Sequence, residues 1–455
     1  MLTNKLKSVE KDFSLRSGTK LKICVIGAGP VGLTTAACLA HLGHSVICVD
    51  TDQMKIAALY NNTIPFYEPG LSQLVKMNCK VGRLIFSTKI KDAVQVSSVI
   101  FIAVGTPTKY NGEPNLTYIK NALKAIGSAM DRYKLIVEKS TVPVTTCDWI
   151  KKTLNQYLQK DIKFDIAYNP EFLREGSAVS DFLNPDRIVL GVETEKAKKL
   201  LLKIYQQIKA PKLVTDIRSA ELIKHSANAF LATKISFINA VANICELTNA
   251  DIKKVAYGLG LDKRIGSYFL NAGIGFGGFC IPKDLKAFVH QAKKIGYNFR
   301  LLKEVERINI EQRERFIKKI IRQLKLKGRQ IGVLGLSFKP NTDDVRSAPS
   351  IEIIKRLKLA GAKIKAYDPK AMSQAKKVIP DIEYCNNPYE VAEDSDCLVI
   401  LTEWQEFQKL DLKKIKKLLK RPIIFDGRNI FEPEKMHKLG FIYHSIGRNS
   451  QNKRK

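Results

Sequence analysis

The residues best suited to chemistry lie in a short glycine-rich segment. Cys280 lies two residues after the last glycine of the segment Gly273–Gly278, and Lys283 and Asp284 come three and four residues after it. A thiol close to cationic groups ionises more readily than an isolated one, and the thiolate is a strong nucleophile. We therefore predict that Cys280 is a catalytic nucleophile. The other eight of the nine cysteines lie in apolar contexts or stand isolated, and we expect them to be structural thiols.

A second pair of candidate residues precedes this segment. Lys224 and Asn228 are four residues apart, so they share one face of a predicted helix. A single lysine on a half-buried helix face is more often a surface residue whose ammonium group reaches water. The pair therefore becomes a catalytic candidate only together with the cysteine segment.

The segment Gly27-Ala28-Gly29-Pro30-Val31-Gly32 follows a predicted strand and opens a predicted helix. In such a loop the first glycine permits a tight turn, the second lets a pyrophosphate approach, and the third allows close helix packing. Asp50 ends the next predicted strand, 18 residues after Gly32. A carboxylate there binds a ribose diol and repels a 2′-phosphate, which favours NAD over NADP. On the glycine loop alone, FAD is also possible.

Eight motifs, in this order between Gly27 and Arg346, resemble those of the UDP-glucose/GDP-mannose dehydrogenase family. They are GAGPVG at 27–32, YEPGL at 67–71, VGTP at 104–107, KSTVPV at 139–144, NPEFLREG at 169–176, the Lys224/Asn228 helix, GFGGFCIPKD at 275–284 and FKPNTDDVR at 338–346. The resemblance implies a four-electron oxidation of a sugar C6 hydroxyl with two NAD. Cys280 would form a thiohemiacetal with the intermediate aldehyde and then a thioester, which water hydrolyses to the acid.

The resemblance also implies roles for individual residues. Lys224 would stabilise the developing alkoxide. Asp284, with Asn228 and Thr141, would hold a water for proton transfer. Glu171 is the candidate base for thioester hydrolysis, and how the acid–base work divides between Lys224, Asp284 and Glu171 stays open. Glu175 is expected one helical turn from Glu171, toward the nicotinamide.

The remaining expected contacts follow from the same resemblance. The cofactor site is expected to contain Gly27, Gly29, Val31, Gly32, Asp50, Lys55, Thr106, Thr141, Glu175, Lys283 and Arg346. The substrate site is expected to contain Glu171, Phe172, Leu173, Lys224, Asn228, Arg264, Phe269, Leu270, Asn271, Gly277, Phe338, Lys339 and Arg428. Arg264 is expected to reach the site of a neighbouring subunit, which implies a homo-oligomer, at least a dimer.

The expected substrate is UDP-glucose, favoured by PDRIV at 185–189 and by Arg264-Ile265-Gly266. GDP-mannose is the alternative, and UDP-N-acetylmannosamine comes third. Three positions depart from the family pattern. Phe279 replaces a small residue, Ile281 replaces an aromatic residue, and Thr145 stands where the family has glycine.

The elements that must position these residues alternate between β-branched runs and amphipathic helices, which indicates parallel sheets covered by helices. We predict an α/β fold of two doubly wound, Rossmann-like domains joined by a central helical region, with a ligand cleft between the domains. The predicted parts are an N-terminal extension at 1–20, an NAD-binding domain at 21–215, a central helical region at 216–326, a UDP-sugar-binding domain at 327–447 and a basic tail at 448–455.

Composition limits the classes of function. The chain has 455 residues and a net charge of +32, which raises a nucleic-acid-binding protein as an alternative of another class. The lysines are spread along the chain without aromatic interleaving, so we expect solvated helix faces and no specific nucleic-acid partner. Cysteines without CxxC or Cys/His clusters predict no metal site and a reducing, cytoplasmic compartment. The uncharged stretch 23–40 is broken by glycine and proline, so no membrane span is expected there.

Overall fold

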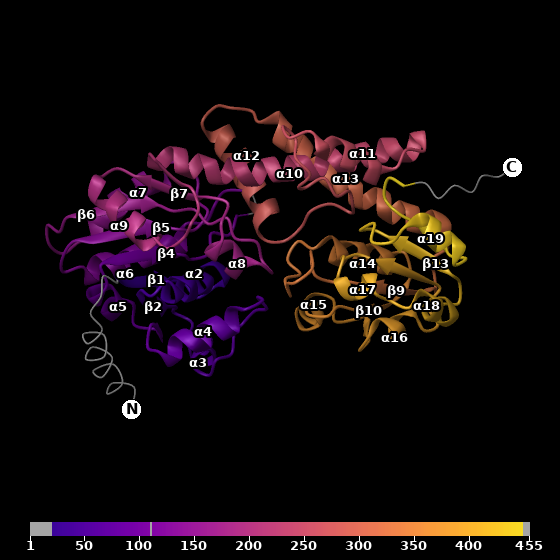
Figure 1. The fold of residues 1–455 in the computed structure, drawn as a ribbon, viewed down its shortest axis with the longest axis horizontal. Coiled ribbons are helices and arrows are strands. Elements are labelled where there is room, and N and C mark those ends of the chain that lie inside the picture. The colour runs from indigo at the N-terminus through magenta and orange to yellow at the C-terminus, as the bar shows by residue number, and fades with distance from the viewer. Residues whose placement is uncertain (1–20, 110–111, 449–455) are drawn as a thin grey trace. The chain divides into compact units, whose positions relative to one another are not determined.

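The computed structural model describes residues 21–109 and 112–448 (Figure 1). The predicted extension at 1–20 and almost all of the predicted basic tail lie outside these described residues. The chain divides into two units, Met1–Ser226 and Ala227–Lys455. The boundary falls within one long helix, α10 (Ile217–Thr248), and each unit has its own sheet.

The first unit is built on a sheet of eight strands in the order β3-β2-β1-β4-β5-β6-β7-β8 (Figure 1). All neighbouring strands are parallel except β6 and β7, which are antiparallel. The order of the first six strands is that of a dinucleotide-binding fold, in which ligands bind at the carboxyl ends of the strands. The strands are β1 (Lys22–Ile26), β2 (Ser45–Val49), β3 (Leu84–Ser87), β4 (Val99–Ile102), β5 (Lys134–Glu138), β6 (Phe164–Tyr168), β7 (Ile188–Val192) and β8 (Lys212–Thr215).

Helices cover both faces of this sheet because its strands are apolar on both faces. Ile23 and Val25 of β1 belong to one buried core, whereas Cys24 and Ile26 belong to the other. Side chains alternate along a strand, so one apolar run supplies both cores. The helices are α2 (Pro30–His41), α3 (Gln53–Tyr60), α4 (Leu71–Lys80), α5 (Ile90–Val96), α6 (Thr117–Ala129), α7 (Thr146–Tyr157), α8 (Ala178–Leu183) and α9 (Glu195–Ile204).

The second unit contains a parallel sheet of six strands in the order β11-β10-β9-β12-β13-β14. Its strands are β9 (Gln330–Leu334), β10 (Lys363–Tyr367), β11 (Glu383–Tyr384), β12 (Cys397–Ile400), β13 (Ile423–Asp426) and β14 (Ile442–His444). Its helices, besides most of α10, are α11 (Ile252–Leu261), α12 (Cys280–Lys294), α13 (Arg300–Gln323), α14 (Pro349–Leu359), α15 (Met372–Val378), α16 (Pro388–Ala392), α17 (Gln405–Gln408), α18 (Leu412–Leu418) and α19 (Pro433–Lys438).

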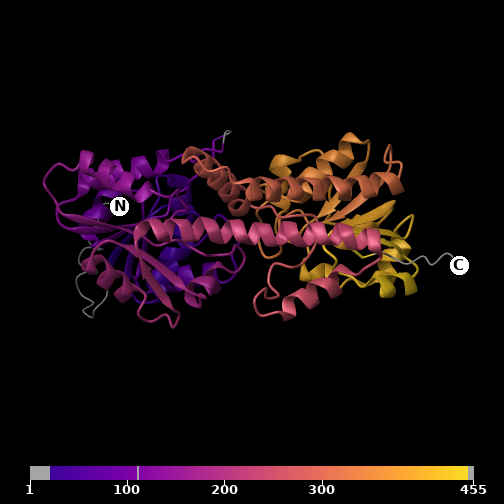
Figure 2. The same ribbon diagram turned by 90° about the horizontal axis from the view of Figure 1, so that it is seen from above.

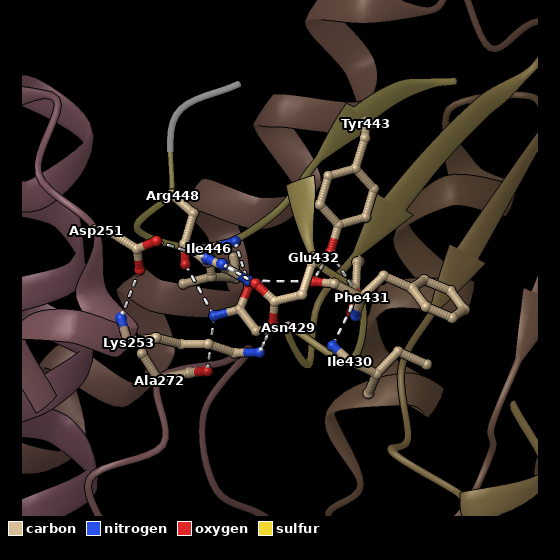
Figure 3. Close-up of polar contacts among 11 residues, drawn as sticks. Asp251, Lys253, Ala272, Asn429, Ile430, Phe431, Glu432, Tyr443, Ile446 and Arg448 are labelled. Atoms are coloured by element: carbon tan, nitrogen blue, oxygen red, sulfur yellow. Dashed lines mark hydrogen bonds and ion pairs between the residues drawn. The ribbon is translucent and has the colours of Figure 1, made fainter. Parts of the chain in front are cut away.

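The chain after β14 is fastened to the start of α11 by a network of charged residues (Figure 3). Arg448 is buried, and its guanidinium donates to Asp251 at 3.2 Å, to Glu432 at 2.5 Å and to the carbonyl of Phe431 at 3.1 Å. Lys253 donates to the other oxygen of Glu432 at 2.7 Å. The network ties the end of the second sheet to the helices that precede the cysteine segment.

Helix α10, drawn along its full length in Figure 2, is long and apolar enough to cross a membrane by length and composition alone. This is a weak indication, because long helices of soluble proteins pass the same test.

The predicted fold class, α/β with two doubly wound domains joined by a central helical region, is confirmed. The sequence pattern predicts strands at Lys22–Ile26, Ser45–Val49, Gln330–Leu334 and Lys363–Tyr367, which match β1, β2, β9 and β10. It predicts helices at Val31–Leu42 and Ser350–Ala360, which are shifted by one residue from α2 and α14. Among the described strands, sequence reasoning missed β3, β7, β8, β11 and β14. Four of these five are edge strands and β7 lies next to an edge, where burial is less complete and the apolar pattern is weaker.

Candidate active site

The loop after β1 adopts the geometry of a dinucleotide-binding turn. Gly27 has a φ of 105°, and a Cβ there would lie 2.4 Å from the carbonyl oxygen of Ala103. A Cβ on Gly32 would lie 1.9 Å from the Gly27 oxygen. Nothing lies within 4 Å of a Cβ built on Gly29. Two glycines are therefore required by packing and the middle one faces open space, which fits the approach of a pyrophosphate to the start of α2.

Asp50, at the end of β2, is fixed beside this loop. Its carboxylate accepts hydrogen bonds from Ala28 N at 2.8 Å, Asp52 N at 3.0 Å and Lys55 Nζ at 2.9 Å. Burial alone would raise the pKa of Asp50, but the hydrogen bonds from Lys55 and the two backbone groups outweigh it and lower the pKa. Lys55, an expected cofactor contact, therefore binds the carboxylate expected to hold the ribose.

Two expected cofactor residues meet at the ends of neighbouring strands. Thr106 follows β4, Thr141 follows β5, and the Thr106 hydroxyl donates to the Thr141 carbonyl at 2.9 Å. Because β4 and β5 are paired in parallel, their carboxyl ends lie at the same edge of the sheet.

Lys224 and Glu171 form a buried ion pair. Lys224 Nζ lies 3.1 Å from Glu171 Oε1, and the two side chains are 3% and 5% exposed. The other carboxylate oxygen of Glu171 accepts from Leu173 N at 2.6 Å. The Lys224 ammonium group and the Glu171 carboxylate, both candidates for the acid–base work, therefore bind each other in this structure.

The Phe172 ring carries a second cation that sequence reasoning missed. The Arg187 guanidinium carbon lies 3.8 Å from the ring centroid, and Lys224 Nζ lies 5.3 Å from it. Burial lowers the pKa of Arg187. Arg187 belongs to the PDRIV segment, which we used only as an indication of the substrate. Nothing in the sequence indicates that Arg187 contacts Phe172.

The segment that follows Glu171 is not helical, and the expectation that Glu175 lies one helical turn from Glu171 is wrong. Residues 171–177 form an irregular loop, and α8 begins only at Ala178. Pro170 precedes the loop, and Gly176 has a φ of 84°, a conformation foreign to a helix. Glu68 of the YEPGL motif holds the end of the loop by accepting from Gly176 N at 2.7 Å and Ala178 N at 2.8 Å.

Cys280 is the first residue of α12, a position that the sequence did not indicate. It is half-buried, and the 15-residue helix begins directly at the thiol. The free N–H groups and the dipole at a helix start favour a thiolate over a thiol. Seven of the other cysteines are buried and Cys79 is half-buried. Burial raises the pKa of each of these eight thiols, of Cys79 to about 11.

The glycines before Cys280 are explained by contacts within the protein. A Cβ on Gly277 would lie 2.4 Å from the Ser347 oxygen, and one on Gly278 would lie 2.7 Å from the Phe338 ring. A Cβ on Gly275 would lie 2.4 Å from Asn309 Oδ1. From the sequence alone, several glycines in so short a segment suggest that the backbone comes close to a ligand, whereas close packing of chain on chain accounts for each of these three. Gly277 stays a predicted substrate contact.

Asp284 joins two further candidate residues. Its Oδ2 accepts from Asn228 Nδ2 at 2.7 Å, and its Oδ1 lies 2.7 Å from Lys283 Nζ. The Asp284 and Lys283 side chains are 2% and 9% exposed. The structure therefore brings together, on α10 and the first turn of α12, the carboxylate and the amide expected to hold a water.

The expected nucleotide-sugar residues are placed in different ways. Arg428 donates to the carbonyls of Leu401 at 2.9 Å and Phe338 at 3.2 Å. Its guanidinium therefore connects these two segments of the second unit. Arg264 is exposed and pairs with Asp262 at 2.6 Å. The others are Phe269, with a φ of 64°, buried Leu270, exposed Asn271, and Lys339, whose Nζ lies 5.7 Å from the Phe338 ring centroid. Arg346, an expected cofactor contact, pairs with Asp344 at 2.6 Å, and its guanidinium carbon lies 4.2 Å from the centroid of the Phe279 ring.

Three consecutive parts of the chain match one family. Residues 21–209 match the UDP-glucose/GDP-mannose dehydrogenase family NAD binding domain, 218–311 the central domain and 332–433 the UDP binding domain. The chain belongs to the UDP-glucose/GDP-mannose dehydrogenase family. It is therefore an NAD-dependent dehydrogenase, and the prediction of NAD as the cofactor is confirmed.

Named relatives cover nearly the whole chain. UDP-glucose 6-dehydrogenase TuaD of Bacillus subtilis is 49% identical over 94% of this chain and 93% of its own. UDP-glucose 6-dehydrogenase of Rhizobium meliloti is 43% identical over 94% of this chain and 100% of its own. The solved structure of a UDP-glucose dehydrogenase from Pyrobaculum islandicum is 37% identical, with a TM-score of 0.89, and covers 96% of this chain and 100% of its own.

Proposed function

We propose that the protein is an NAD-dependent UDP-glucose 6-dehydrogenase that converts the C6 alcohol of UDP-glucose into the carboxylate of UDP-glucuronate. The observation that carries the proposal is the half-buried Cys280 at the start of α12, beside the contact between Asn228 and Asp284. A nucleophile at this place is needed only if the oxidation continues past the aldehyde. Relatives named for this reaction, 43% to 49% identical over nearly the whole chain, support the choice of substrate.

The reaction consists of two oxidations and one hydrolysis. Bound NAD would supply the hydride acceptor for both oxidations, and each oxidation at C6 releases one proton overall. The first oxidation gives the aldehyde, to which the Cys280 thiolate adds, and the resulting alkoxide takes up a proton to form a thiohemiacetal. The second oxidation removes the remaining C6 hydride and the hydroxyl proton to give a thioester. Water then adds to the thioester, the C–S bond breaks, and the carboxylate, the free thiolate and two protons are released.

The candidate residues other than Cys280 supply charge and proton transfer. Lys224 is a buried cation that stabilises the oxyanions formed at C6. The Asn228–Asp284 pair holds the water that takes up and returns protons. Glu171 activates the hydrolytic water, which requires that its contact with Lys224 loosen once the thioester has formed. We assign the cofactor to the loop around Gly29 and to Asp50, Thr106 and Glu175.

We further propose three functional parts: an NAD-binding domain at 21–215, a central helical region at 216–326 and a UDP-sugar-binding domain at 327–447. The three family matches support this division. Arg428, Phe338 and Lys339 are assigned to the nucleotide sugar in the third part. An arginine suits this task because its planar guanidinium pairs with two phosphate oxygens.

We propose a cytoplasmic homodimer that uses the outer face of α10 as its interface. Phe230, Phe237 and Ile244 are spaced seven residues apart, so they lie on one face of the helix, and they are 65%, 54% and 58% exposed. Large apolar side chains in such a row are typical of a surface covered by another chain. A second copy would present the same row, as two-fold symmetry requires. Exposed Arg264 is then available to the partner's site.

The deciding experiment counts NADH released per molecule of sugar supplied. UDP-glucose, GDP-mannose and UDP-N-acetylmannosamine are offered in separate reactions with excess NAD. We expect two NADH per molecule of UDP-glucose. The rate of NADH formation with each of the other sugars should be less than about a tenth of the rate with UDP-glucose. A GDP-mannose rate above the UDP-glucose rate would overturn the substrate assignment, and one NADH per sugar would overturn the four-electron reaction.

Substitution of Cys280 tests the covalent step. Cys280→Ala should lower kcat by at least about 10³-fold, because the second oxidation loses its nucleophile. Cys280→Ser should also turn over very slowly and should accumulate an ester at position 280, visible by intact-mass spectrometry, since an alkoxide is a poorer leaving group than a thiolate. Cys79→Ser, at the other half-buried cysteine, is the control and should keep normal turnover. Two NADH per sugar at a near-normal rate from Cys280→Ala would exclude the mechanism.

A further inference from the structure

Asp368 lies at the carboxyl edge of the second sheet, beside the 335–339 loop that contains Phe338 and Lys339. It directly follows β10, and the loop directly follows β9, the strand that pairs in parallel with β10. Parallel strands bring their carboxyl ends to one edge of the sheet. Asp50 has the same position in the first sheet, because it follows β2, the parallel neighbour of β1.

The two carboxylates bind the neighbouring loop alike but differ in burial. Asp50 accepts from Ala28 N, in the loop after β1, at 2.8 Å. Asp368 accepts from Leu336 N, in the loop after β9, also at 2.8 Å. Asp50 is half-buried, whereas Asp368 is 1% exposed. The Asp368 carboxylate is therefore turned over to the protein's own loop, while that of Asp50 keeps a surface for a ligand.

Four hydrogen bonds converge on one oxygen of Asp368. Its Oδ2 accepts from Leu336 N at 2.8 Å, from Ser337 N and Oγ at 3.1 Å each, and from the indole Nε1 of Trp404 at 3.0 Å. Its Oδ1 accepts from two backbone N–H groups of the turn after β10, at 2.9 and 2.8 Å. Hydrogen bonds to a carboxylate are stronger than those between neutral groups. One side chain thus joins the turn after β10, the loop after β9 and the loop after β12.

The carbonyls of the same two loop residues are held by other buried side chains. Ser350 Oγ, in the first turn of α14, donates to the Leu336 carbonyl at 2.5 Å. Thr402 Oγ1, after β12, donates to the Ser337 carbonyl at 2.6 Å. Ser350 and Thr402 are 1% and 0% exposed. The backbone N–H and C=O groups of Leu336 and Ser337 therefore all bond to side chains. Buried backbone groups are costly to leave unpaired, so these side chains fix the path of the loop.

The path of this loop leads directly to residues assigned to the nucleotide sugar. Phe338 and Lys339 are the next residues in the chain, and Arg428 donates to the Phe338 carbonyl at 3.2 Å. A shift of the Leu336–Ser337 backbone would move both side chains and the carbonyl that Arg428 binds. The contacts of Asp368 therefore affect three of the residues expected at the nucleotide.

We propose that Asp368 and Trp404 are positioning residues, which together hold the 335–339 loop in the shape that binds uridine diphosphate. The inference rests on the proposed function, in which Phe338, Lys339 and Arg428 contact the nucleotide sugar. A loop that is ordered beforehand loses less conformational freedom when the ligand binds. Loss of the contact between Asp368 and Trp404 weakens the binding of UDP and leaves NAD binding and the chemistry at Cys280 unchanged.

The first experiment measures the Kd of the full chain for UDP and for NAD by titration calorimetry. Trp404→Phe keeps an aromatic ring and removes the N–H donor, so it should raise the Kd for UDP by about three- to tenfold. Asp368→Asn, which leaves a single acceptor oxygen, should raise it further. The Kd for NAD should stay at the wild-type value in both variants. The KM for UDP-glucose should rise in parallel while kcat changes little. An unchanged Kd for UDP in both variants would overturn the proposal.

Asp396→Asn is the matched control. Asp396 is also a buried carboxylate, 4% exposed, and accepts from Gln330 N at 3.0 Å, at the opposite end of β9. This variant should lose stability and keep the wild-type Kd for UDP. An equal loss of UDP affinity in the Asp396 and Asp368 variants would show a general destabilisation and would overturn the proposal. Ser337→Ala, which removes one donor to Asp368, takes the place of Asp368→Asn if the asparagine variant does not fold.

The second experiment follows the order of the loop by hydrogen exchange and mass spectrometry. Peptides that contain Leu336 and Ser337 should exchange faster in Trp404→Phe than in wild type, because these two N–H groups donate to Asp368. UDP should slow the exchange in wild type. Weaker UDP binding with unchanged exchange in Trp404→Phe would mean that the indole acts on the nucleotide by another route, and would overturn the proposal.

Titration with GDP separates this inference from the proposed function. The titrations require no turnover, so their results do not depend on Cys280. Binding of GDP in place of UDP by wild type would overturn the proposed substrate. The same variants titrated with GDP would then test the loop. Weaker GDP binding in Trp404→Phe would retain the positioning role for the nucleotide, and an unchanged Kd would remove it.

Discussion

At the scale of single residues, Asp50 shows how a buried carboxylate is kept ionised. Burial disfavours its charge, and three hydrogen bonds restore it, so the pKa falls. One of the donors, Ala28 N, belongs to the glycine loop itself. The carboxylate predicted to select the ribose and the turn predicted to admit the pyrophosphate are thus one hydrogen-bonded unit.

We predict that Asp50→Ser raises kcat/KM for NADP relative to NAD by at least about tenfold. The substitution removes the anion that repels a 2′-phosphate and releases Lys55, which lies 2.9 Å away, to pair with that phosphate. Asp52→Ser is the control, since Asp52 caps α3 by accepting from Lys55 N at 3.0 Å. An unchanged ratio in Asp50→Ser would show that cofactor choice lies elsewhere.

Sequence reasoning found the candidate residues but not their partners. The spacing of Gly27, Gly29 and Gly32 predicts their roles because the loop is local. Lys224 and Glu171 are 53 residues apart, and their ion pair depends on how α10 packs on the sheet. No local pattern carries that information. Thr145 could be predicted in part. The sequence shows that it departs from the glycine of the family pattern, and only the structure shows its φ of 76°, which explains why glycine suits the position.

At the scale of elements, the carboxyl ends of the strands of the first unit bury polar groups as well as presenting them. Glu138, the last residue of β5, is fully buried and accepts from Ser140 N at 2.8 Å. Burial raises the pKa of Glu138 to about 8, although the hydrogen bonds with Ser140 oppose the shift. The group therefore holds a proton in the folded protein over a range of pH in which the unfolded chain is ionised.

This shift predicts how stability depends on pH. The pKa of Glu138 is raised on folding, so its contribution is fully present below about pH 4.5 and is lost as the pH rises through about 8. Urea unfolding should give a larger loss of stability between pH 5 and pH 8 for wild type than for Glu138→Gln, by more than about 1 kcal/mol. Equal losses in the two proteins would show that Glu138 keeps an ordinary pKa.

In the second unit, a buried charged group, Arg448, lies at the centre of a network of hydrogen bonds and ion pairs (Figure 3). Arg448→Met removes the donor to Asp251, Glu432 and Phe431 and leaves these acceptors without it, so we predict a loss of about 1–3 kcal/mol in the free energy of unfolding. Lys253→Met, at a 43% exposed side chain of the same network, should cost less than about 0.5 kcal/mol. Chemical denaturation of both variants tests the difference, and equal losses would contradict it.

At the scale of the whole molecule, the apolar row on α10 favours the proposed association of two copies, whereas the net charge of +32 opposes it. Like charges on two copies repel one another, and an apolar interface must overcome that repulsion. The α/β class could be predicted from alternating patterns, and the functional parts were assigned from the resemblance to the family. The exposure of this row could not, because apolar residues at helical spacing look the same whether they face a core or a partner.

Sedimentation velocity at micromolar concentrations should show a dimer for wild type. Phe237→Asp should shift the protein toward monomer by placing a charge at the centre of the row. Leu359→Asp, at an 84% exposed apolar residue on α14, is the control and should leave the dimer intact. A higher salt concentration should strengthen the dimer by screening the repulsion. Monomeric wild type would overturn the assigned interface.

The contrast among the nine cysteines has a practical consequence. Seven thiols are buried, and Cys79 has a pKa raised to about 11, so at neutral pH these eight are protonated and poorly reactive. A small electrophile added in limited amount should therefore label Cys280 first, without any engineering of the chain. The protein can receive a single reporter group at the start of α12, and occupancy of that position can be followed by loss of labelling. The same selectivity makes this thiol the first place where a mild oxidant would act.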